Sequence, residues 1–439
     1  MKKIFNVLFI SIFSLMLCDA QENLNVSDAV KLTLENNLDI KITENQNKIF
    51  KNNASFLNSG YLPKLSTSAG FNKSKQNVEI ETPNNLTGKL DNMKSENSFS
   101  NISLEYVLFD NNGRKFNFKK SKELSSRSEL EVKEVIENTL IQLYSIFYEV
   151  CRLNEEKEII KSSLEISKSR LERNKTKFEF GQSTKLELLN AEVDVNTDSI
   201  RYLNAIKNLS NAKRDLNLVM NVDLDSDYIL DQGVVYNSKE NIISFYNNAA
   251  ENNNKLKIYD KSVEISGYEL KSIRSTYLPT IGLIGSYDWN ESINDNPYAF
   301  FNKNIYDGIS GGVNLRWDVF KSGKRVTENK NAKVMLENSK IEKEKAYLMF
   351  QKELNNSHDT YKNNLFILEV QEQSLNTSNN NFLRNSEKYE IGLVSSIEFR
   401  NAQLNLLNAK LSRNKARYDA KLSELYFLKV SGVIIDSSF

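Results

Sequence analysis

The sequence is poor in the side chains that most often carry catalysis or bind metal ions. Its 439 residues include one histidine, His358, and two cysteines, Cys18 and Cys151. A disulfide framework, a zinc cluster and a Cys-His nucleophilic pair all need more of these side chains than the chain has. We therefore expect no enzyme activity, no catalytic residue, no metal site and no cofactor.

Proline and an excess of charge of one sign are also scarce. The four prolines leave very long stretches free of proline, as continuous helices require, because an interior proline costs a helix about 3 kcal/mol. The 58 Lys and Arg residues balance the 57 Asp and Glu residues, so no basic field favours nucleic acid. A phosphate-binding loop of the Gly-x-x-x-x-Gly-Lys type is missing as well, which argues against energy coupling within this chain.

Long apolar runs are limited to the amino terminus. Residues 1–20 begin with a basic stretch, continue with an apolar run and end at the small Ala20, which is the pattern of a secretory signal peptide. The run is shorter than the roughly 20 residues of a membrane-spanning helix. Leu17 precedes Cys18 where bacterial lipoprotein signals have a small residue, which disfavours lipid attachment.

The rest of the chain contains the same plan twice. Glu-Asn-Asn at 35–37 recurs at 251–253, and Tyr-Leu-Pro at 61–63 recurs at 277–279. Further markers follow in the same order: Leu104–Phe109 with Leu315–Phe320, Phe178–Gly181 with Tyr389–Gly392, Asn190-Ala191 with Asn401-Ala402, and Asn221 with Gly432. This order predicts an internal duplication. The expected divisions are the signal peptide 1–20, a first repeat 21–239 with the linker 222–239, and a second repeat 240–439 with a C-terminal tail.

Each half is expected to begin with a helix and a pair of strands. The predicted first helices are 27–58, which Ser27 caps, and 241–275. Apolar residues then alternate with polar ones, which indicates strands with one apolar face. The predicted strand pairs are 64–109 and 280–320, each interrupted by a polar, loop-like segment, at 74–98 and 290–306.

Long helical hairpins follow the strands. The stretch from Gly113 to about Phe178 has neither glycine nor proline, and its apolar residues are spaced by three and four, as in a coiled-coil seam. Another helix returns after each Phe/Tyr-x-x-Gly marker. The predicted hairpins are therefore 113–220 and 324–430.

The number of strands predicts association of several chains. A bilayer admits strands only as closed barrels, because unpaired backbone groups cannot be hydrated there. Four strands per chain are fewer than the roughly eight with which membrane barrels start, so we expect several copies to share one barrel. A soluble four-stranded sheet attached to a coiled coil is the alternative, and composition alone leaves it open.

The duplication, the Tyr-Leu-Pro before each strand pair and the Tyr-x-x-Gly followed by Asn-Ala together resemble the TolC-like outer-membrane efflux and secretion channels. This resemblance covers nearly the whole mature chain. It implies a mainly α fold with membrane β: long antiparallel coiled-coil hairpins and four membrane strands per chain. It also implies a homotrimer with a twelve-stranded barrel, which lies in outer-membrane lipid and continues as a helical tunnel in the periplasm. Such channels are passive exit ducts for small molecules or proteins, and they work with a periplasmic adaptor and an energised inner-membrane pump.

The resemblance assigns adaptor docking to the two turns that join the long helices. These tips are Gly181, Gln182, Ser183 and Thr184 in the first repeat, and Gly392, Leu393, Val394 and Ser395 in the second. Glycine supplies the positive φ of a tight reversal, and Ser183 and Ser395 can cap the returning helices. The alternative is that these residues only end one helix and start the next. Gln182 departs from the family's tip motif.

The resemblance also places an aperture beside the tips. Glu187 and Glu398, six residues after each glycine, correspond to acids that narrow the closed tunnel end, and three copies of them would attract cations. Asn190 and Asn401 replace a further family acid, so a ring at that level is hydrogen-bonding and uncharged. Tyr389 is expected to donate a hydrogen bond to Glu187 and hold the tip shut. A solvated helix face is the alternative for both glutamates.

Two other classes of protein remain as alternatives. A periplasmic adaptor also has a coiled-coil hairpin, but it has only one, flanked by small β domains, so the duplication argues against it. A structural coiled coil of the cell envelope should lack both a consistent apolar strand face and paired tip glycines. The transported substrate, the pump and the adaptor are not named by the sequence.

Overall fold

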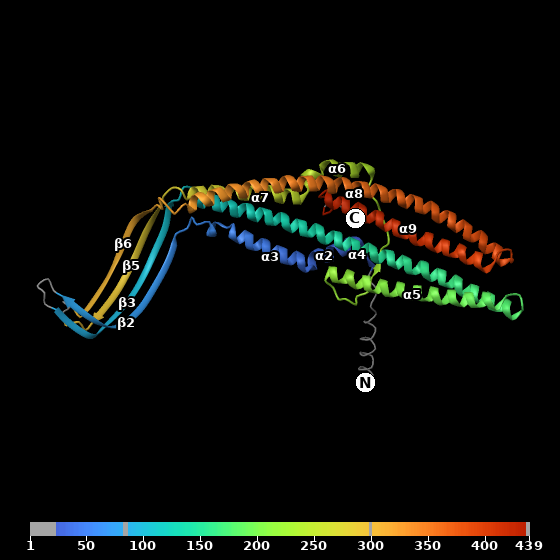
Figure 1. Cartoon of the computed structure of the whole chain (residues 1–439), viewed down its shortest axis with the longest axis horizontal. Helices are drawn as coiled ribbons and strands as arrows, with labels where there is room; N and C mark the ends of the chain where they lie inside the picture. The colour runs from blue at the N-terminus through green and yellow to red at the C-terminus, as the bar shows by residue number, and fades with distance from the viewer. Residues whose placement is uncertain (1–22, 82–86, 298–300, 436–439) are drawn as a thin grey trace, which may run out of the picture. The chain divides into compact units, whose positions relative to one another are not determined.

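The computed structural model describes residues 23–81, 87–297 and 301–435 (Figure 1). The predicted signal peptide, with Cys18, lies outside these residues. The chain divides into two compact units, one of residues up to Asn45, 130–257 and from Lys345 onward, the other of residues 46–129 and 258–344. Each unit takes residues from both halves of the sequence, so the compact units are not the predicted repeats.

The long helical hairpins form within one residue of the predicted bounds. They consist of α4 (Gly113–Glu179) with α5 (Lys185–Met220), and α8 (Lys324–Glu390) with α9 (Ser396–Val430). The sequence forms these helices because nothing interrupts them: proline and glycine occur at the turns and not within the long stretches. In the part of the chain that the structure describes, no helix is both long enough and apolar enough to cross a membrane.

The first helix of each half is broken, which the sequence analysis did not predict. The helices are α2 (Val26–Asn36) and α3 (Leu38–Asn53) in the first half, and α6 (Lys239–Asn252) and α7 (Asn254–Ser275) in the second. The predicted cap at Ser27 is wrong, because the side chain of Asn25 accepts the capping hydrogen bond, from the Asp28 N–H. Ser238 caps α6 in the same way.

The repeated Glu-Asn-Asn motif explains both breaks. The Asn37 amide donates to the carbonyl of Val219 at 3.1 Å, and the Asn253 amide donates to the carbonyl of Val430 at 2.9 Å. The side-chain oxygen of each asparagine also accepts from the first turn of the following helix. Each asparagine therefore starts one helix and holds the end of the returning helix of its own hairpin.

A residue with positive φ follows each returning helix within two positions and lies close to the same break. Asn221 has a φ of 51° and donates from its side chain to the carbonyl of Asn36 at 3.3 Å. Gly432 has a φ of 73°, and a Cβ there would lie 2.6 Å from the carbonyl carbon of Asn252. One half thus uses a side-chain hydrogen bond where the other uses close backbone contact that only glycine allows.

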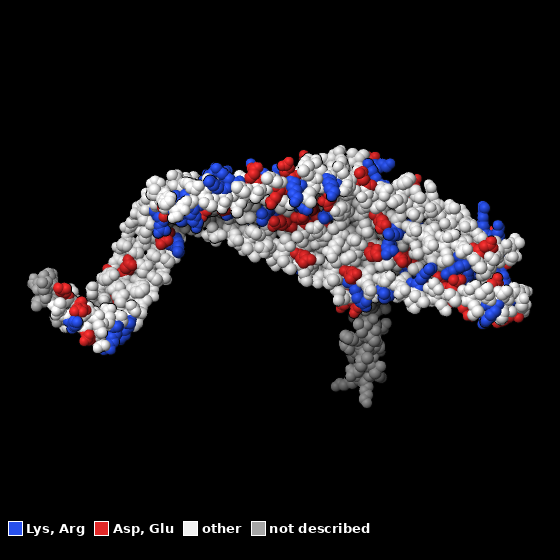
Figure 2. Space-filling view, in the orientation of Figure 1, with Lys and Arg blue, Asp and Glu red and all other residues white. Residues whose placement is uncertain are grey.

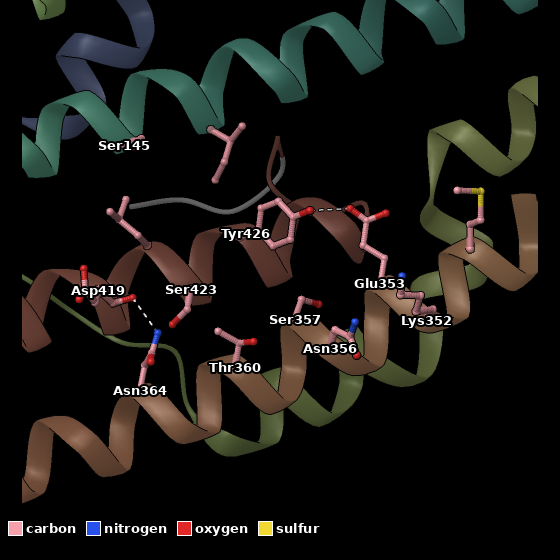
Figure 3. Close-up of a pocket in the computed structure, with 13 residues that line it drawn as sticks. Ser145, Lys352, Glu353, Asn356, Ser357, Thr360, Asn364, Asp419, Ser423 and Tyr426 are labelled. Carbon is pink, nitrogen blue, oxygen red and sulfur yellow. Dashed lines mark hydrogen bonds between the residues drawn. The ribbon is translucent and has the colours of Figure 1, made fainter.

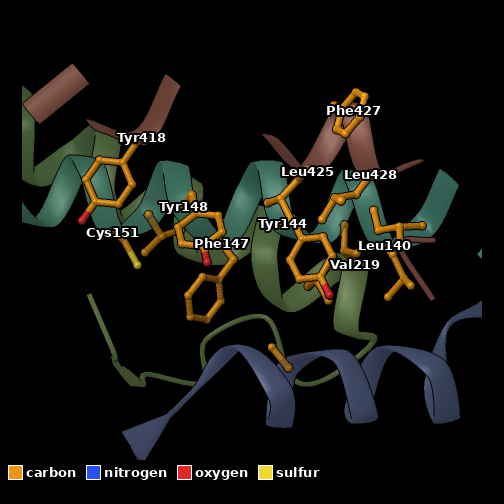
Figure 4. Close-up of a cluster of buried hydrophobic side chains, with 14 of the residues drawn as sticks. Leu140, Tyr144, Phe147, Tyr148, Cys151, Val219, Tyr418, Leu425, Phe427 and Leu428 are labelled. Atoms are coloured by element: carbon orange, nitrogen blue, oxygen red, sulfur yellow. The ribbon is translucent and has the colours of Figure 1, made fainter. Parts of the chain in front are cut away.

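The hydrophobic core of the first unit follows the predicted seam of α4 (Figure 4). Leu140, Phe147 and Val150 are each at most 2% exposed, and Leu425 and Phe427 of α9 are fully buried in the same cluster. Burial of a side chain of this size contributes about 1.5–3 kcal/mol. The core therefore holds the helices of both hairpins together.

The linker between the halves is fixed to α9. Its short strand β4 (Ile229–Leu230) pairs in parallel with β1 (Asn23–Leu24). The side chains of Arg417 and Lys421 donate to linker carbonyls at 2.8 and 2.6 Å, and the Glu424 carboxylate accepts a linker N–H at 2.5 Å. Side chains on successive turns of α9 thus form hydrogen bonds with backbone groups of the linker, which is mostly neither helix nor strand.

The second unit contains a four-stranded antiparallel sheet in the order β2-β3-β5-β6. The strands are β2 (Lys64–Glu81), β3 (Thr87–Phe109), β5 (Thr280–Asn294) and β6 (Lys303–Arg316). The predicted loops at 74–98 and 290–306 are wrong, because the strands continue well into both segments. Hydrogen bonds between strands join backbone groups and do not need apolar side chains. The strands therefore continue beyond the residues in which apolar and polar side chains alternate. The second pair also ends earlier than predicted, at Arg316 and not at 320.

The two faces of this sheet differ in polarity. Leu65, Phe71, Ile309 and Val313 share one face and are 66–88% exposed. Serines and asparagines are the most frequent residues on the other face. Figure 2 shows little charge over the middle of the strands and more toward their ends, whereas both signs are interspersed along the helices.

Replacing the asparagine at a helix break should weaken the first unit. Asn253→Ala removes the hydrogen bond to Val430 and the cap of α7, which should cost about 1–3 kcal/mol. Asn248→Ala, at an exposed position of α6, is the matched control and should be neutral or slightly stabilising. Thermal unfolding followed by circular dichroism measures both, and equal midpoints would contradict the role of Asn253.

Candidate functional site

The two turns between the long helices have the same backbone geometry. Gly181 and Gly392 have φ values of 70° and 80°. The next N–H in each turn, of Gln182 or Leu393, donates back to the preceding helix at 2.7 or 2.8 Å, as in a Schellman motif. A Cβ at either glycine would meet no described atom within 4 Å, so backbone conformation and not space requires glycine here.

The returning helices begin with different caps. Ser395 and Glu398 form a capping box: the Glu398 N–H donates to the Ser395 hydroxyl at 3.2 Å, and the Ser395 N–H donates to the Glu398 carboxylate at 2.8 Å. The predicted cap at Ser183 is wrong, because Thr184 accepts from the Glu187 N–H. Ser183 donates its hydroxyl proton to the Glu187 carboxylate instead.

Both predicted aperture acids lie in the first turn of a returning helix. Glu398 is exposed and Glu187 is half-buried, and the positive end of each helix dipole favours their charge. The Ser395 backbone N–H and then its hydroxyl hold the pKa of Glu398 below its ordinary value. Asn190 and Asn401, one turn further on, are exposed. Each tip therefore presents an acid and an amide on consecutive turns.

The predicted hydrogen bond from Tyr389 to Glu187 does not form within the chain. Tyr389 is 5% exposed, and its hydroxyl donates to the side-chain oxygen of Asn174 at 2.8 Å. Its ring stacks on Phe399, with the centroids 4.6 Å apart. Asn174 in turn donates to the Glu187 backbone carbonyl at 3.4 Å and to the Ser396 hydroxyl at 3.3 Å. Asn174 thus links Tyr389 to α5 by hydrogen bonds. It accepts the hydrogen bond that Glu187 was expected to accept.

Sequence reasoning missed a buried polar cluster that joins the two hairpins near the tips. Arg400 of α9 donates to both carboxylate oxygens of Asp198 of α5, at 2.7 and 3.0 Å, and to the Ser167 hydroxyl of α4 at 3.0 Å. Arg170 of α4 pairs with Asp194 of α5 and also donates to the Ser396 carbonyl of α9 at 3.5 Å. Arg170, Arg400 and Asp198 are buried and Asp194 is partly exposed, so these ionic contacts favour one packing of the hairpins.

The electrostatics of this cluster favour the charged forms. Burial alone would raise the pKa of Asp198, but hydrogen bonds from Arg400 and Ser167, together with the charge of Arg400, outweigh it and lower that pKa. One signal of the cluster was present in the sequence. Arg400 occupies the position that Leu189 has in the first half, and Asp198 the position that Ala409 has in the second. At these two positions, a charged residue in one half stands where the other half has an apolar residue.

A separate cavity of about 710 Å³ lies among α4, α8 and α9 (Figure 3). Its lining mixes hydroxyl, amide and apolar side chains. The Tyr426 hydroxyl donates to the Glu353 carboxylate at 2.5 Å, and the Asn364 amide donates to the Asp419 carbonyl at 3.4 Å. None of the residues that line it belongs to the predicted tips or aperture.

Comparisons with known proteins agree with this arrangement. A family model described as "Outer membrane efflux protein" matches residues 29–222 and 245–432. The chain is 20% identical over 297 residues to the outer membrane protein TolC of Vibrio cholerae, covering 67% of this chain and 68% of that protein. It is 19% identical over 412 residues to the alkaline protease secretion protein AprF of Pseudomonas aeruginosa, covering 93% of this chain and 84% of that protein.

Solved structures show the same fold. The CmeC outer membrane channel of Campylobacter jejuni matches with a TM-score of 0.77 and 18% identity, over 93% of this chain and 86% of that one. The outer membrane protein VceC of Vibrio cholerae matches with a TM-score of 0.77 and 12% identity, over 93% of this chain and 96% of that one. The predicted fold class, mainly α with long helical hairpins joined to four strands, is confirmed.

Removing the arginine of the buried cluster should be costly. Arg400→Met removes the nearer of the two arginines that pair with the buried Asp198 carboxylate, which should destabilise the first unit by about 3–5 kcal/mol. Arg384→Met, at an exposed position of α8, is the control and should change stability little. Unfolding midpoints that shift equally in the two variants would contradict the cluster's role.

The same cluster predicts a pH dependence. Because the pKa of Asp198 is lower in the folded than in the unfolded chain, its contribution is complete above the unfolded value of about 3.9 and is lost as pH falls below it. The native protein should therefore lose stability below about pH 4 more steeply than Asp198→Asn. Thermal midpoints across this range measure the difference, and parallel curves would count against it.

The tip glycines should be sensitive to any side chain. Gly392→Ala forces alanine to a φ of 80° and should cost about 1–2 kcal/mol. Gly267→Ala, in α7 with open space around its Cβ, should instead stabilise by about 0.5–1 kcal/mol. Opposite shifts of the two unfolding midpoints support the turn geometry, and a neutral Gly392→Ala contradicts it.

Proposed function

Because the chain belongs to the outer membrane efflux protein family, we propose that it is the outer-membrane exit duct of a tripartite efflux or secretion system. The match of the family model to both halves of the chain carries this conclusion. The fold supports it, since long helical hairpins and a sheet with one apolar face suit a tunnel attached to a membrane segment. In this proposal the duct is passive. It works with a periplasmic adaptor and an inner-membrane pump, as the channels of this family do.

The active form we propose is a homotrimer. Strands β2 and β6 are the edges of the four-stranded sheet, so each has one side that pairs with no described strand of its own chain. Three copies bring β6 of one chain beside β2 of the next and close a twelve-stranded barrel. The exposed apolar face then contacts lipid and the polar face lines the duct.

For the tips, we propose adaptor docking and gating. The residues Gly181, Gln182, Ser183 and Thr184, with Gly392, Leu393, Val394 and Ser395, are the docking surface. Glu187, Asn190, Glu398 and Asn401 line the aperture, and Tyr389 positions the tip through Asn174. The exposure of Glu398 and both asparagines supports this assignment, since their side chains are available to a solute.

The cargo we propose is small molecules or proteins. The family is described as efflux proteins, and the relative AprF is named for the secretion of an alkaline protease. The match of the family model to both halves argues against an adaptor, and the apolar face of the sheet and the paired tip glycines argue against a structural coiled coil without a pore.

Single-channel recording in planar bilayers tests the duct and its aperture together. The purified mature protein should give a stable, cation-preferring conductance, and the double variant Glu187→Gln/Glu398→Gln should reduce that preference because it removes the acids at the tips. Glu192→Gln/Glu387→Gln, at exposed helix positions, is the matched control and should behave as the native protein.

Each outcome decides one part of the proposal. If Glu187→Gln/Glu398→Gln conducts with the native cation preference, the duct is supported and the assignment of these acids to the aperture is wrong. A folded trimer without conductance contradicts the duct.

A further inference from the structure

The polar face of the sheet carries a continuous row of hydroxyls. Strand register places Ser66, Ser103, Ser286 and Ser310 side by side across all four strands. The Ser66 and Ser103 hydroxyls lie 2.9 Å apart, and those of Ser286 and Ser310 lie 2.8 Å apart. These contacts confirm that the four side chains project from the same face.

The next row on this face contains a fixed carboxylate. It consists of Ser68, Asn101, Asp288 and Gly308. The Asn101 amide donates to one oxygen of Asp288, and the Ser286 hydroxyl donates to the other at 2.6 Å. Two neutral donors thus orient the charge of Asp288 without neutralising it.

The surroundings of Asp288 leave its charge uncompensated. On one side lies the serine row, and on the other lies a row of Gly70, Phe99, Asn290 and Tyr306. All of these side chains are uncharged. Glu105, another acid of this face, stands opposite Lys64 in the register, so a cation accompanies it.

The opposite face supplies a close comparison. Asp307 lies one residue from the row of Asp288, but strand alternation turns it to the apolar face. There it accepts a hydrogen bond from the Tyr287 hydroxyl at 3.2 Å. The two carboxylates are therefore at nearly the same level of the sheet and on different sides.

We propose that Asp288 makes the strand-lined part of the duct selective for cationic solutes, as a second site distinct from the tip acids. The inference rests on the proposed function, because three chains are needed to bring three copies of Asp288 to one level around a common axis. A ring of carboxylates in a pore raises the local concentration of cations and lowers that of anions. The neighbouring Phe99 and Tyr306 rings add faces that attract organic cations.

Reversal potentials under a KCl gradient test the proposal. They are best recorded at or below about 0.1 M salt, where charges act over about 10 Å. We expect Asp288→Asn to reduce the ratio of potassium to chloride permeability about twofold or more, toward unity. Asp307→Asn, on the lipid-facing side, is the matched control and should keep the native ratio.

A gain of charge gives a second readout that does not depend on the tolerance of Asp288 to replacement. Ser68→Asp adds a carboxylate to the same row and should raise the ratio above the native value. Trimers that resist dissociation until heated confirm assembly of each variant.

The failures of the two proposals can be distinguished. Conducting native protein with an unchanged ratio in both Asp288→Asn and Ser68→Asp overturns the assignment of Asp288 alone. Folded native trimers that do not conduct overturn the duct, and this assignment with it.

Discussion

Backbone pairing at the two edges of the sheet is the constraint on which the rest of this protein depends. Strands β2 and β6 have 18 and 14 residues, and each lies at an edge of the four-stranded sheet. In lipid, every unpaired N–H or C=O group costs several kcal/mol, so this sheet is stable in a membrane only when other copies complete it. The proposed trimer meets that requirement, because β6 of one copy pairs with β2 of the next.

The two halves of the chain follow one plan, but their differences carry the specific contacts. Glu398 closes a capping box, whereas Glu187 accepts from Ser183 and leaves the cap to Thr184. Arg400 and Asp198 replace apolar residues of the matching positions and join the hairpins through buried charge. A duplicated helical hairpin can thus assemble symmetrically while its tip is held by contacts that exist only once per chain.

Much of the fold was predictable because it depends on local rules. The bounds of α4, α5, α8 and α9 follow from glycine, serine and the lack of proline, and they agree with the structure within a residue. The breaks at Asn37 and Asn253 were missed because asparagine is tolerated within a helix, and its reason for breaking one is a distant carbonyl. The strand ends were missed because ladder bonds continue where apolar alternation stops.

The candidate site was less predictable for a related reason. The turns and their acids stand at fixed spacings, which sequence alone reveals. The partner of Tyr389 is set instead by how the helices pack, because Asn174 lies near the end of α4, 215 residues from Tyr389 in the sequence. The family resemblance implied Glu187 of α5 as the acceptor, whereas the Tyr389 hydroxyl donates to the side-chain oxygen of Asn174 of α4.

The mass of the mature protein, extracted from the outer membrane in mild detergent, tests the central claim most directly. Native mass spectrometry or sedimentation should give three chains per particle, since three copies pair every strand edge. A stable, folded single chain, with β2 and β6 left open in the membrane fraction, would contradict the account.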